Sequence, residues 1–328
     1  MYTSFPIIGH DWAVAQIQRA FNNGRVRHAF LLQGPASIGK TTFARSIAMS
    51  LNCTNEPKPC GECRACRLIA SNGHPDITIV EADRIGGTLK INQIRELQRQ
   101  LALRPYEGRY RVAILRRFQE AQAAAQNAIL KTLEEPVGNV VLILTAEEPS
   151  AILPTIHSRC QIFNLRPLSI ASTTDALQQS WGLQRDKASA LAHLSGGRIG
   201  WAVRSLDDEK ELEFRQNAID LLEQSLSSTR VQRFQLVDGL NLDKSRTLDM
   251  LDFWQTYWRD VMLLAVGSNA ALTNIDHEAS LISVAQHVGQ DDAQRALEAT
   301  RTALIQLSGN ANSRLCLEVL MLNYPRLN

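Results

Sequence analysis

Residues 28–42 read His-Ala-Phe-Leu-Leu-Gln-Gly-Pro-Ala-Ser-Ile-Gly-Lys-Thr-Thr, and this stretch decides the fold of the first part of the chain. The apolar run at residues 29–32 predicts a buried strand, residues 34–41 match GxxxxGK[ST], and residues 41–51 have a helical pattern. Strand, glycine loop and helix in this order are the context in which the pattern marks a phosphate-binding loop. The stretch therefore predicts an α/β domain with a phosphate site.

The loop predicts ATP or ADP as a ligand. Its backbone N–H groups would wrap the phosphates, Lys40 would reach the β and γ oxygens, and Thr41 would hold Mg²⁺. Ser37 stands where many such loops have glycine, so a positive φ at this residue carries a steric cost. The alternative is a loop that is kept only for packing. The predicted nucleotide-binding residues of this loop are Gly34, Gly39, Lys40, Thr41 and Thr42.

Two arginines stand where a hydrolysing enzyme needs acids. The apolar strand at residues 111–115 runs directly into Arg116 and Arg117. In phosphate-loop enzymes, acids at the end of a later strand hold Mg²⁺ and orient the attacking water, and two guanidinium groups would repel the metal. The sequence predicts a nucleotide that is held without hydrolysis. The other acids considered do not replace the missing pair: Asp76, Glu120, Glu134 and Glu135.

The alternation of strand and helix signals divides the chain. Expected strands at residues 77–80, 111–115 and 140–144 alternate with expected helices at 91–101 and 119–133, and a further helix is expected at 11–21. Continuous apolar strands between helices indicate a parallel sheet covered on both faces. Beyond Pro167 only helical signals remain, at 173–179, 185–194, 199–206, 214–226, 247–266, 281–288, 291–307 and 313–322. We therefore expect an α/β domain at 1–166, a small helical domain at 167–208 and an all-helical domain at 209–328.

Composition sets wide limits on function. The chain has 328 residues, 45% of them hydrophobic, and a formal net charge of +2. That length suffices for two or three domains, and the charge excludes a strongly basic nucleic-acid arm without naming a partner. No apolar run approaches the roughly 20 residues that cross a bilayer. We therefore expect a cytoplasmic protein that does not contact a membrane.

Four of the six cysteines are clustered in the pattern C-x6-C-x2-C-x2-C: Cys53, Cys60, Cys63 and Cys66. Four thiolates at this spacing can close a tetrahedral Zn²⁺ site without an open position, which makes the metal structural. The alternatives are free or redox-active thiols, and a zinc module that contacts nucleic acid. The charged residues around the cluster form no basic stripe with aromatic residues, which favours a local folding role.

Several separated blocks resemble one family, the bacterial clamp-loader AAA+ subunits. They are residues 28–34 before the phosphate loop, the cysteine cluster, the run from Gln126 to Pro136, and the run from Leu153 to Cys160. The resemblance covers about the first 210 residues, and the last third resembles a collar-domain helix only at residues 257–260. The loss of the acidic pair is similar to the delta-prime subunits of the DNA polymerase III clamp loader, and not to the ATP-hydrolysing gamma/tau subunits.

The resemblance implies roles for matching residues. Arg159 of Ser158-Arg159-Cys160 matches an arginine finger that projects onto the ATP of a neighbouring subunit, where a guanidinium can be worth about 10³ to 10⁵ in rate. The alternative is that Arg159 makes only a local salt bridge. Thr145 matches the sensor 1 position, whereas Gly200 stands at the sensor 2 position with Arg198 two residues earlier. The implied helical domains are a lid and an oligomerisation collar.

The implied partners are the gamma/tau and delta subunits, with the sliding clamp and primer-template DNA reached through the complex. Two other functions stay open: an ATP-hydrolysing gamma/tau-like motor whose acids lie elsewhere, and a zinc-containing nucleic-acid-binding protein. His28 and His74 are expected to be structural. The aromatic stripe of Phe253, Trp254, Tyr257 and Trp258 is expected to form a helix-packing core, with base stacking as the alternative.

Overall fold

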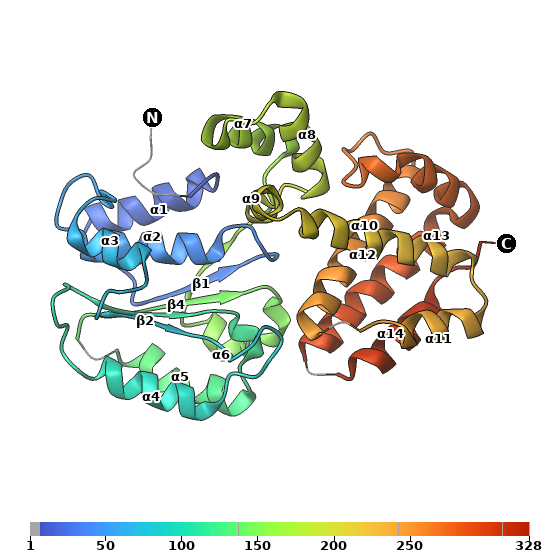
Figure 1. Ribbon diagram of the computed structural model, residues 1–328. Coiled ribbons are helices and arrows are strands. Elements are labelled where there is room, and N and C mark those ends of the chain that lie inside the picture. The colour runs from blue at the N-terminus through green and yellow to red at the C-terminus, as the bar shows by residue number, and fades with distance from the viewer. Residues whose placement is uncertain (1–6, 137, 242, 310, 328) are drawn as a thin grey trace. The chain divides into compact units, whose positions relative to one another are not determined.

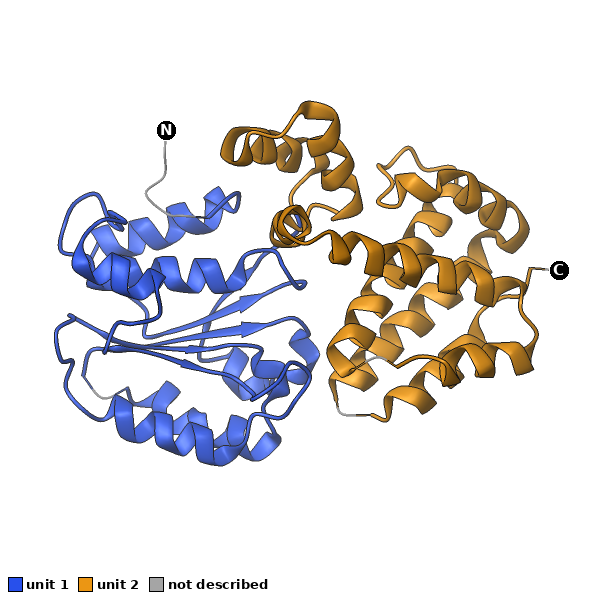
Figure 2. Cartoon of the chain, in the orientation of Figure 1, with its two compact units in different colours: residues 1–167 blue, residues 168–328 orange. Residues whose placement is uncertain are grey.

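The structure is a computed structural model that describes residues 7–136, 138–241, 243–309 and 311–327. The chain divides into two compact units, the first unit at residues 1–167 and the second unit at 168–328 (Figure 2). Each unit has its own hydrophobic core, as expected for a chain of this length.

The first unit is built on a five-stranded parallel sheet in the order β2-β3-β4-β1-β5 (Figure 1). The strands are β1 (Ala29–Gln33), β2 (Ile77–Val80), β3 (Arg111–Leu115), β4 (Val140–Ala146) and β5 (Gln161–Asn164). β4 lies between β1 and β3, with Ala29 opposite Leu142 and Arg111 opposite Val140. The expected α/β fold with a parallel sheet is therefore confirmed.

Helices cover both faces of this sheet, and the alternation of side chains explains why the strands are apolar throughout. One face packs against α1 (Asp11–Asn22), α2 (Lys40–Asn52) and α3 (Arg64–Ala70), and the other against α4 (Ile91–Leu101), α5 (Ala123–Glu134) and α6 (Pro154–His157) (Figure 1). In β3, the side chains of Val112 and Ile114 pack in the core with α1, α2 and α3. Those of Ala113 and Leu115 pack in the core with α4, α5 and α6. Strands buried on both faces read as continuous apolar runs.

One expected helix begins later than the pattern indicated. Residues 119–133 were expected to be helical, but α5 begins at Ala123 and is preceded by the 3₁₀ turn η1 (Phe118–Glu120). Ala121 pairs with Leu89 in an isolated parallel bridge, and the Leu89 N–H donates to the Glu120 carbonyl at 2.9 Å. This bridge holds the backbone extended just before the helix. Helical periodicity does not predict such a contact, because Leu89 is far away in the sequence.

Four short elements were not predicted as such: α3, α6, β5 and, in the second unit, α11 (Arg230–Asp238). A 3₁₀ turn, η2 (Pro149–Ala151), precedes α6. α3 and α6 have seven and four residues, which is too few for a periodic apolar signal. The edge strand β5 contains two polar residues at its ends, Gln161 and Asn164, and only Phe163 of it is buried.

Among the described residues of the second unit, all regular elements are helices. Its elements are α7 (Ile170–Trp181), α8 (Arg185–Leu194), α9 (Ile199–Asp207), α10 (Glu209–Ser227), α11, α12 (Lys244–Ala265), η3 (Ile275–His277), α13 (Glu278–Ser308) and α14 (Ser313–Asn323). α13 is interrupted at Gly289, with φ 71° and ψ 179°, which agrees with the two separate helices expected there. Only glycine adopts this conformation at low cost.

The aromatic stripe of α12 lies in the core of the second unit, as expected. Trp254, Tyr257 and Trp258 are fully buried, and the Trp254 Nε1 donates to the Ala218 carbonyl at 2.7 Å. Base stacking by this stripe is therefore ruled out, because stacking requires exposed ring faces. Trp201 of α9 contributes to the same core.

Among the described residues, no helix combines the length and apolarity that crossing a membrane requires.

Candidate functional site

The predicted phosphate loop lies at the carboxyl end of β1 and leads into α2. Gly34 has φ 143°, and a Cβ at this position would lie 2.3 Å from the Leu165 carbonyl oxygen, so only glycine fits. Gly39 forms the N-cap of α2 with φ 97°. Ser37 adopts φ 63°, the positive value whose steric cost was expected. The loop therefore has a positive φ even at its non-glycine position.

Lys40 is buried and folds back onto its own loop. Its Nζ donates to the carbonyl oxygens of Gly34 at 2.7 Å and Pro35 at 2.5 Å, and it lies 3.7 Å from a carboxylate oxygen of Glu147. Burial lowers the pKa of Lys40, and Glu147 offsets part of that fall. Glu147 follows β4 and was not singled out from the sequence. It is the carboxylate that the structure brings to the loop lysine.

Arg116 and Arg117 follow β3 and form an ion network with two acids. Arg116 lies 3.2 Å from Glu81, and Arg117 lies 2.7 Å from Glu81 and 3.0 Å from Glu120. The Gly86 N–H also donates to Glu120 at 2.7 Å. Burial raises the pKa of Glu120, while the Gly86 N–H and Arg117 lower it in part. Both carboxylates thus pair with arginines, Glu81 through both oxygens and Glu120 through Oε1.

Thr145 lies near the end of β4, next to this network. Its hydroxyl accepts a hydrogen bond from the Arg117 backbone N–H at 3.0 Å. Arg117 itself has φ 47°, a left-handed conformation that the hydrogen bond and the ion pairs hold in place. The predicted sensor 1 residue is therefore hydrogen-bonded to the backbone of Arg117.

Arg198 is the N-cap residue of α9 and is buried in the second unit. Its Nε donates to the Ser195 carbonyl at 2.8 Å, and its guanidinium pairs with Asp252. An arginine held in this way has a structural partner within its own unit.

Arg159 follows α6 and is tied to its own subunit by a local ion pair. Its guanidinium lies 2.5 Å from Glu134 at the end of α5 and donates to the Thr155 carbonyl at 2.9 Å. The side chains of Arg159 and Glu134 are 34% and 48% exposed, so the pair is accessible to solvent. The local salt bridge of the alternative interpretation, in which Arg159 has only a structural role, is therefore present. Exposed ion pairs of this kind stabilise a protein by only about 0–1 kcal/mol. Breaking the pair with Glu134 therefore costs little free energy.

Arg159 also lines a cavity of about 590 Å³ in the first unit. The lining residues come from α1, from the segment before β1 and from the segment before β5: Gln16, Arg19, Ala20, Asn23, Arg25, Arg27, His28, Ala29, Ser158, Arg159, Cys160 and Gln161. Arg19, Arg25 and Arg27 were not singled out from the sequence. Their only signal there is that three arginines fall within nine residues before a buried strand.

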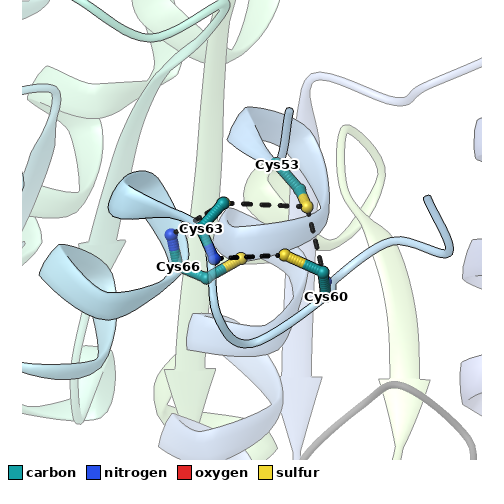
Figure 3. A group of neighbouring side chains, drawn as sticks. All are labelled: Cys53, Cys60, Cys63 and Cys66. Atoms are coloured by element: carbon teal, nitrogen blue, oxygen red, sulfur yellow. Dashed lines mark hydrogen bonds between the residues drawn. The ribbon is translucent and has the colours of Figure 1, made fainter. Parts of the chain in front are cut away.

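The four clustered cysteines meet at the end of α2 and the start of α3 (Figure 3). Their sulfur atoms all lie within 4.8 Å of one another, and the Sγ atoms of Cys53 and Cys63 are 3.9 Å apart. A tetrahedral site with metal–sulfur bonds of about 2.3 Å requires sulfur separations of about 3.8 Å. The cluster can therefore hold a metal ion.

Backbone N–H groups support the sulfurs of this cluster. The Cys63 N–H donates to the Cys60 sulfur at 3.3 Å, and the Cys66 N–H donates to the Cys63 sulfur at 3.5 Å. Burial raises the pKa of Cys63, but the N–H groups of Cys66 and Thr54 outweigh it and lower that pKa to about 6. Burial also raises the pKa of Cys66. The N–H groups thus stabilise negative charge on a sulfur, as a metal ligand requires.

A second group of possible ligands lies in the second unit: Asp220, Glu223 and His277. His277 Nδ1 pairs with Glu223 at 3.2 Å, and its Nε2 contacts the Gln216 amide at 2.9 Å. Both ring nitrogens are engaged, so the group is a hydrogen-bond network and not an open metal site.

The two histidines singled out from the sequence are structural, as expected. The Nε2 atom of His28 lies 2.8 Å from the Leu133 carbonyl oxygen. His74 is buried, and its Nδ1 accepts from the Asp76 N–H at 3.1 Å.

Known proteins match this chain along most of its length. Residues 9–169 match the family described as DNA polymerase III, delta subunit. A DNA polymerase III subunit delta' from Pseudomonas aeruginosa is 32% identical over 240 residues, which are 70% of this chain and 66% of that protein. A subunit delta' from Bacillus subtilis is 28% identical over 311 residues, 93% of each protein.

Other matches are partial or distant. A DNA polymerase III subunit gamma/tau from Mycobacterium tuberculosis is 37% identical over 166 residues, and the match spans 49% of this chain but only 28% of that protein. The solved structure of a DNA polymerase III gamma subunit-related protein from Thermotoga maritima aligns over 94% of this chain and 97% of its own, at 14% identity and a TM-score of 0.44. The two subunits delta' match more of this chain than this gamma/tau subunit does. The chain therefore belongs to the family of DNA polymerase III delta' subunits.

Proposed function

We propose that the chain is a clamp-loader subunit that does not hydrolyse ATP itself and supplies Arg159 to the ATP site of a neighbouring subunit. The observation that carries this proposal is the ion network of Arg116 and Arg117 with Glu81 and Glu120. This network occupies the strand end where a phosphate-loop enzyme holds its Mg²⁺-binding acids. A nucleotide at Gly34, Gly39, Lys40, Thr41 and Thr42, with Thr145 nearby, would be ATP or ADP and would not be turned over.

The partners follow from the family. The matched relatives are DNA polymerase III subunits named delta' and gamma/tau. We infer that the chain assembles with gamma/tau and delta subunits and reaches the sliding clamp and primer-template DNA through that complex. Residues 167–208 would form the lid and residues 209–328 the collar through which the subunits associate. Cys53, Cys60, Cys63 and Cys66 would hold one structural Zn²⁺.

The isolated chain tests the first half of the proposal. Because two arginines lie at this strand end and pair with Glu81 and Glu120, we expect no steady ATP hydrolysis above that of a Lys40→Ala control. Steady ATP hydrolysis by the wild-type chain that is lost in Lys40→Ala would contradict the proposal that the chain does not hydrolyse ATP.

A hydrolysing gamma/tau-like motor is the second candidate. It is favoured by the placement of Glu147, a partly exposed acid 3.7 Å from Lys40. If the chain is such a motor, the isolated chain should hydrolyse ATP and Glu147→Gln should abolish that activity.

The assembled complex tests the second half. We expect Arg159→Ala to leave assembly intact and to slow hydrolysis at one ATP site by about 10³-fold or more, because a finger stabilises charge in the transition state. Arg159→Lys should rescue only part of the rate, since an ammonium lacks the planar fork of a guanidinium. Single-turnover hydrolysis by the reconstituted complex measures both.

Glu134→Gln is the matched control, because it breaks the same local ion pair and leaves the guanidinium in place. If Arg159 serves only that pair, the two variants must have the same effect. We expect Glu134→Gln to hydrolyse ATP at the wild-type rate. Equal losses in both variants, or wild-type rates in Arg159→Ala, would contradict a role in trans.

A further inference from the structure

The arginine cavity is defined by the lining residues given above. It lies at the amino ends of strands β1 and β5, whereas the phosphate loop follows the carboxyl end of β1. It touches Ala29 at the start of β1 and Gln161 just as β5 begins, whereas Gly34 follows the far end of β1. A strand rises about 3.3 Å per residue, so five residues separate the two places by roughly 16 Å. The cavity is therefore a second site in the first unit, distinct from the chain's own nucleotide loop.

The charged side chains that line this cavity are basic. Arg19, Arg25, Arg27 and Arg159 line it, and among the described lining residues none is acidic. Arg25 and Arg27 are exposed, and in the described part of the chain neither side chain is paired with a carboxylate. Arg159 is paired with Glu134, which does not line the cavity. Several guanidinium groups that line one cavity with no acidic residue among the lining form a site for an anion.

The shape of the site favours a compact polyphosphate over a nucleic-acid backbone. A volume of about 590 Å³ falls in the range of about 300–1,000 Å³ that is usual for small-ligand pockets. The arginines line this concave space from three segments of the chain. A duplex presents its phosphates along an extended convex surface and is bound by a basic stripe or face.

We propose that the arginine cavity binds the triphosphate of a nucleoside triphosphate presented by a neighbouring subunit, with Arg25 and Arg27 as phosphate contacts beside Arg159. That a neighbouring subunit presents this triphosphate rests on the function proposed above. On binding, Arg159 exchanges the Glu134 carboxylate for phosphate oxygens. Arg25 and Arg27 bind the triphosphate in the ground state, whereas Arg159 acts mainly in the transition state.

The test measures binding of inorganic triphosphate to the full chain by calorimetry. Lys40→Ala is the parent, so that the chain's own phosphate loop does not contribute. We expect Arg25→Ala and Arg27→Ala each to weaken binding about tenfold or more, which is the lower end of the range for one charge-assisted contact. Arg95→Ala removes an exposed arginine of α4 outside the cavity and should change the affinity by less than about twofold.

Three results would overturn the proposal. The first is an unchanged affinity in both cavity variants, and the second is an equal loss in Arg95→Ala, which would indicate attraction by net charge alone. The third is tighter binding of a duplex oligonucleotide than of triphosphate, with the same dependence on Arg25 and Arg27, which would assign the cavity to a nucleic-acid backbone. Thermal melts of each variant establish that the exposed substitutions leave the fold intact.

The reconstituted complex separates this proposal from the proposed function. If Arg159→Ala slows ATP hydrolysis but Arg25→Ala and Arg27→Ala alter neither triphosphate binding nor the KM for ATP, the cavity proposal fails and the finger stands. If the cavity variants weaken triphosphate binding while Arg159→Ala hydrolyses normally, the anion site stands and the finger fails. The proposal as a whole predicts a higher KM in Arg25→Ala and a lower kcat in Arg159→Ala.

Discussion

At the scale of single residues, the role of each charge in this chain depends on its partners. Asp76 precedes β2, and its carboxylate accepts from the N–H groups of Tyr106 at 2.6 Å, Glu107 at 2.9 Å and Gly108 at 2.7 Å. Arg111 lies 3.7 Å away. Burial raises the pKa of Asp76, but the three N–H groups and Arg111 outweigh it and hold the pKa below its usual value. This acid ties a loop to the sheet and is not available for catalysis.

Asp76→Asn should destabilise the first unit by about 1.5–3 kcal/mol at neutral pH, the range for hydrogen bonds to a charged group. Because the pKa is lowered on folding, the stabilisation is present above the unfolded pKa of about 3.9 and is lost as the pH falls through the folded value. The difference in unfolding free energy between wild type and variant should therefore be constant from about pH 7 to pH 5 and shrink at lower pH. Urea unfolding at a series of pH values measures it.

Asp83→Asn is the matched control, since Asp83 is an exposed acid of the same unit. Its effect should stay within about 0.5 kcal/mol at every pH. A difference for Asp76→Asn that persists unchanged at about pH 3 would show that the carboxylate charge is not the source of the stabilisation.

At the scale of elements, the cysteine module supports one end of a core helix. Cys53 follows α2, Cys63 is the N-cap of α3, and its sulfur accepts from the Cys66 N–H. Cys66 and Ile69 of α3 are buried in the core between α1, α2 and the sheet. If the cluster holds the proposed Zn²⁺, its removal would therefore loosen α3 without a direct effect on the phosphate loop.

Cys63→Ser should lower the metal content of the purified chain and increase hydrogen exchange in α3, because three ligands leave a tetrahedral site open. Cys160→Ser is the control and should keep the metal, since Cys160 lies outside the cluster. Elemental analysis of freshly purified protein gives the metal identity and amount. Absence of zinc from the wild-type chain would count against the proposed site.

At the scale of the whole molecule, the second unit carries apolar side chains that its own core does not cover. In α14, Leu315 is 60% exposed and Val319 is 58% exposed, and they are spaced four residues apart on one side of the helix. Val231 of α11 is 66% exposed. These side chains support the proposal that residues 209–328 associate with other subunits.

Deleting residues 209–328 should abolish stable assembly with the gamma/tau and delta partners. The first unit should keep its fold, because the sheet and both of its cores lie within residues 1–167. Size-exclusion chromatography of the mixed subunits and circular dichroism of the truncated chain measure the two outcomes. A truncated chain that elutes in the full complex would refute the collar assignment.

The local sequence determined the parts of this protein that depend on neighbouring residues. The strand, loop and helix around Lys40 could be predicted because they are contiguous, and the convergence of the four cysteines because they all lie between residues 53 and 66. The strands at 77–80 and 111–115 were found at their observed bounds because continuous apolar runs indicate burial on both faces.

Only the tertiary structure decided which distant charges meet. Arg117 pairs with Glu81 and Arg159 with Glu134, and the cavity joins the segment around Arg25 to the segment before β5. The extended bridge at Ala121 that delays α5 depends on Leu89 in the same way. Periodicity and propensity act over a few residues, whereas these contacts depend on the order in which the strands pair, which places residues far apart in sequence at one edge of the sheet.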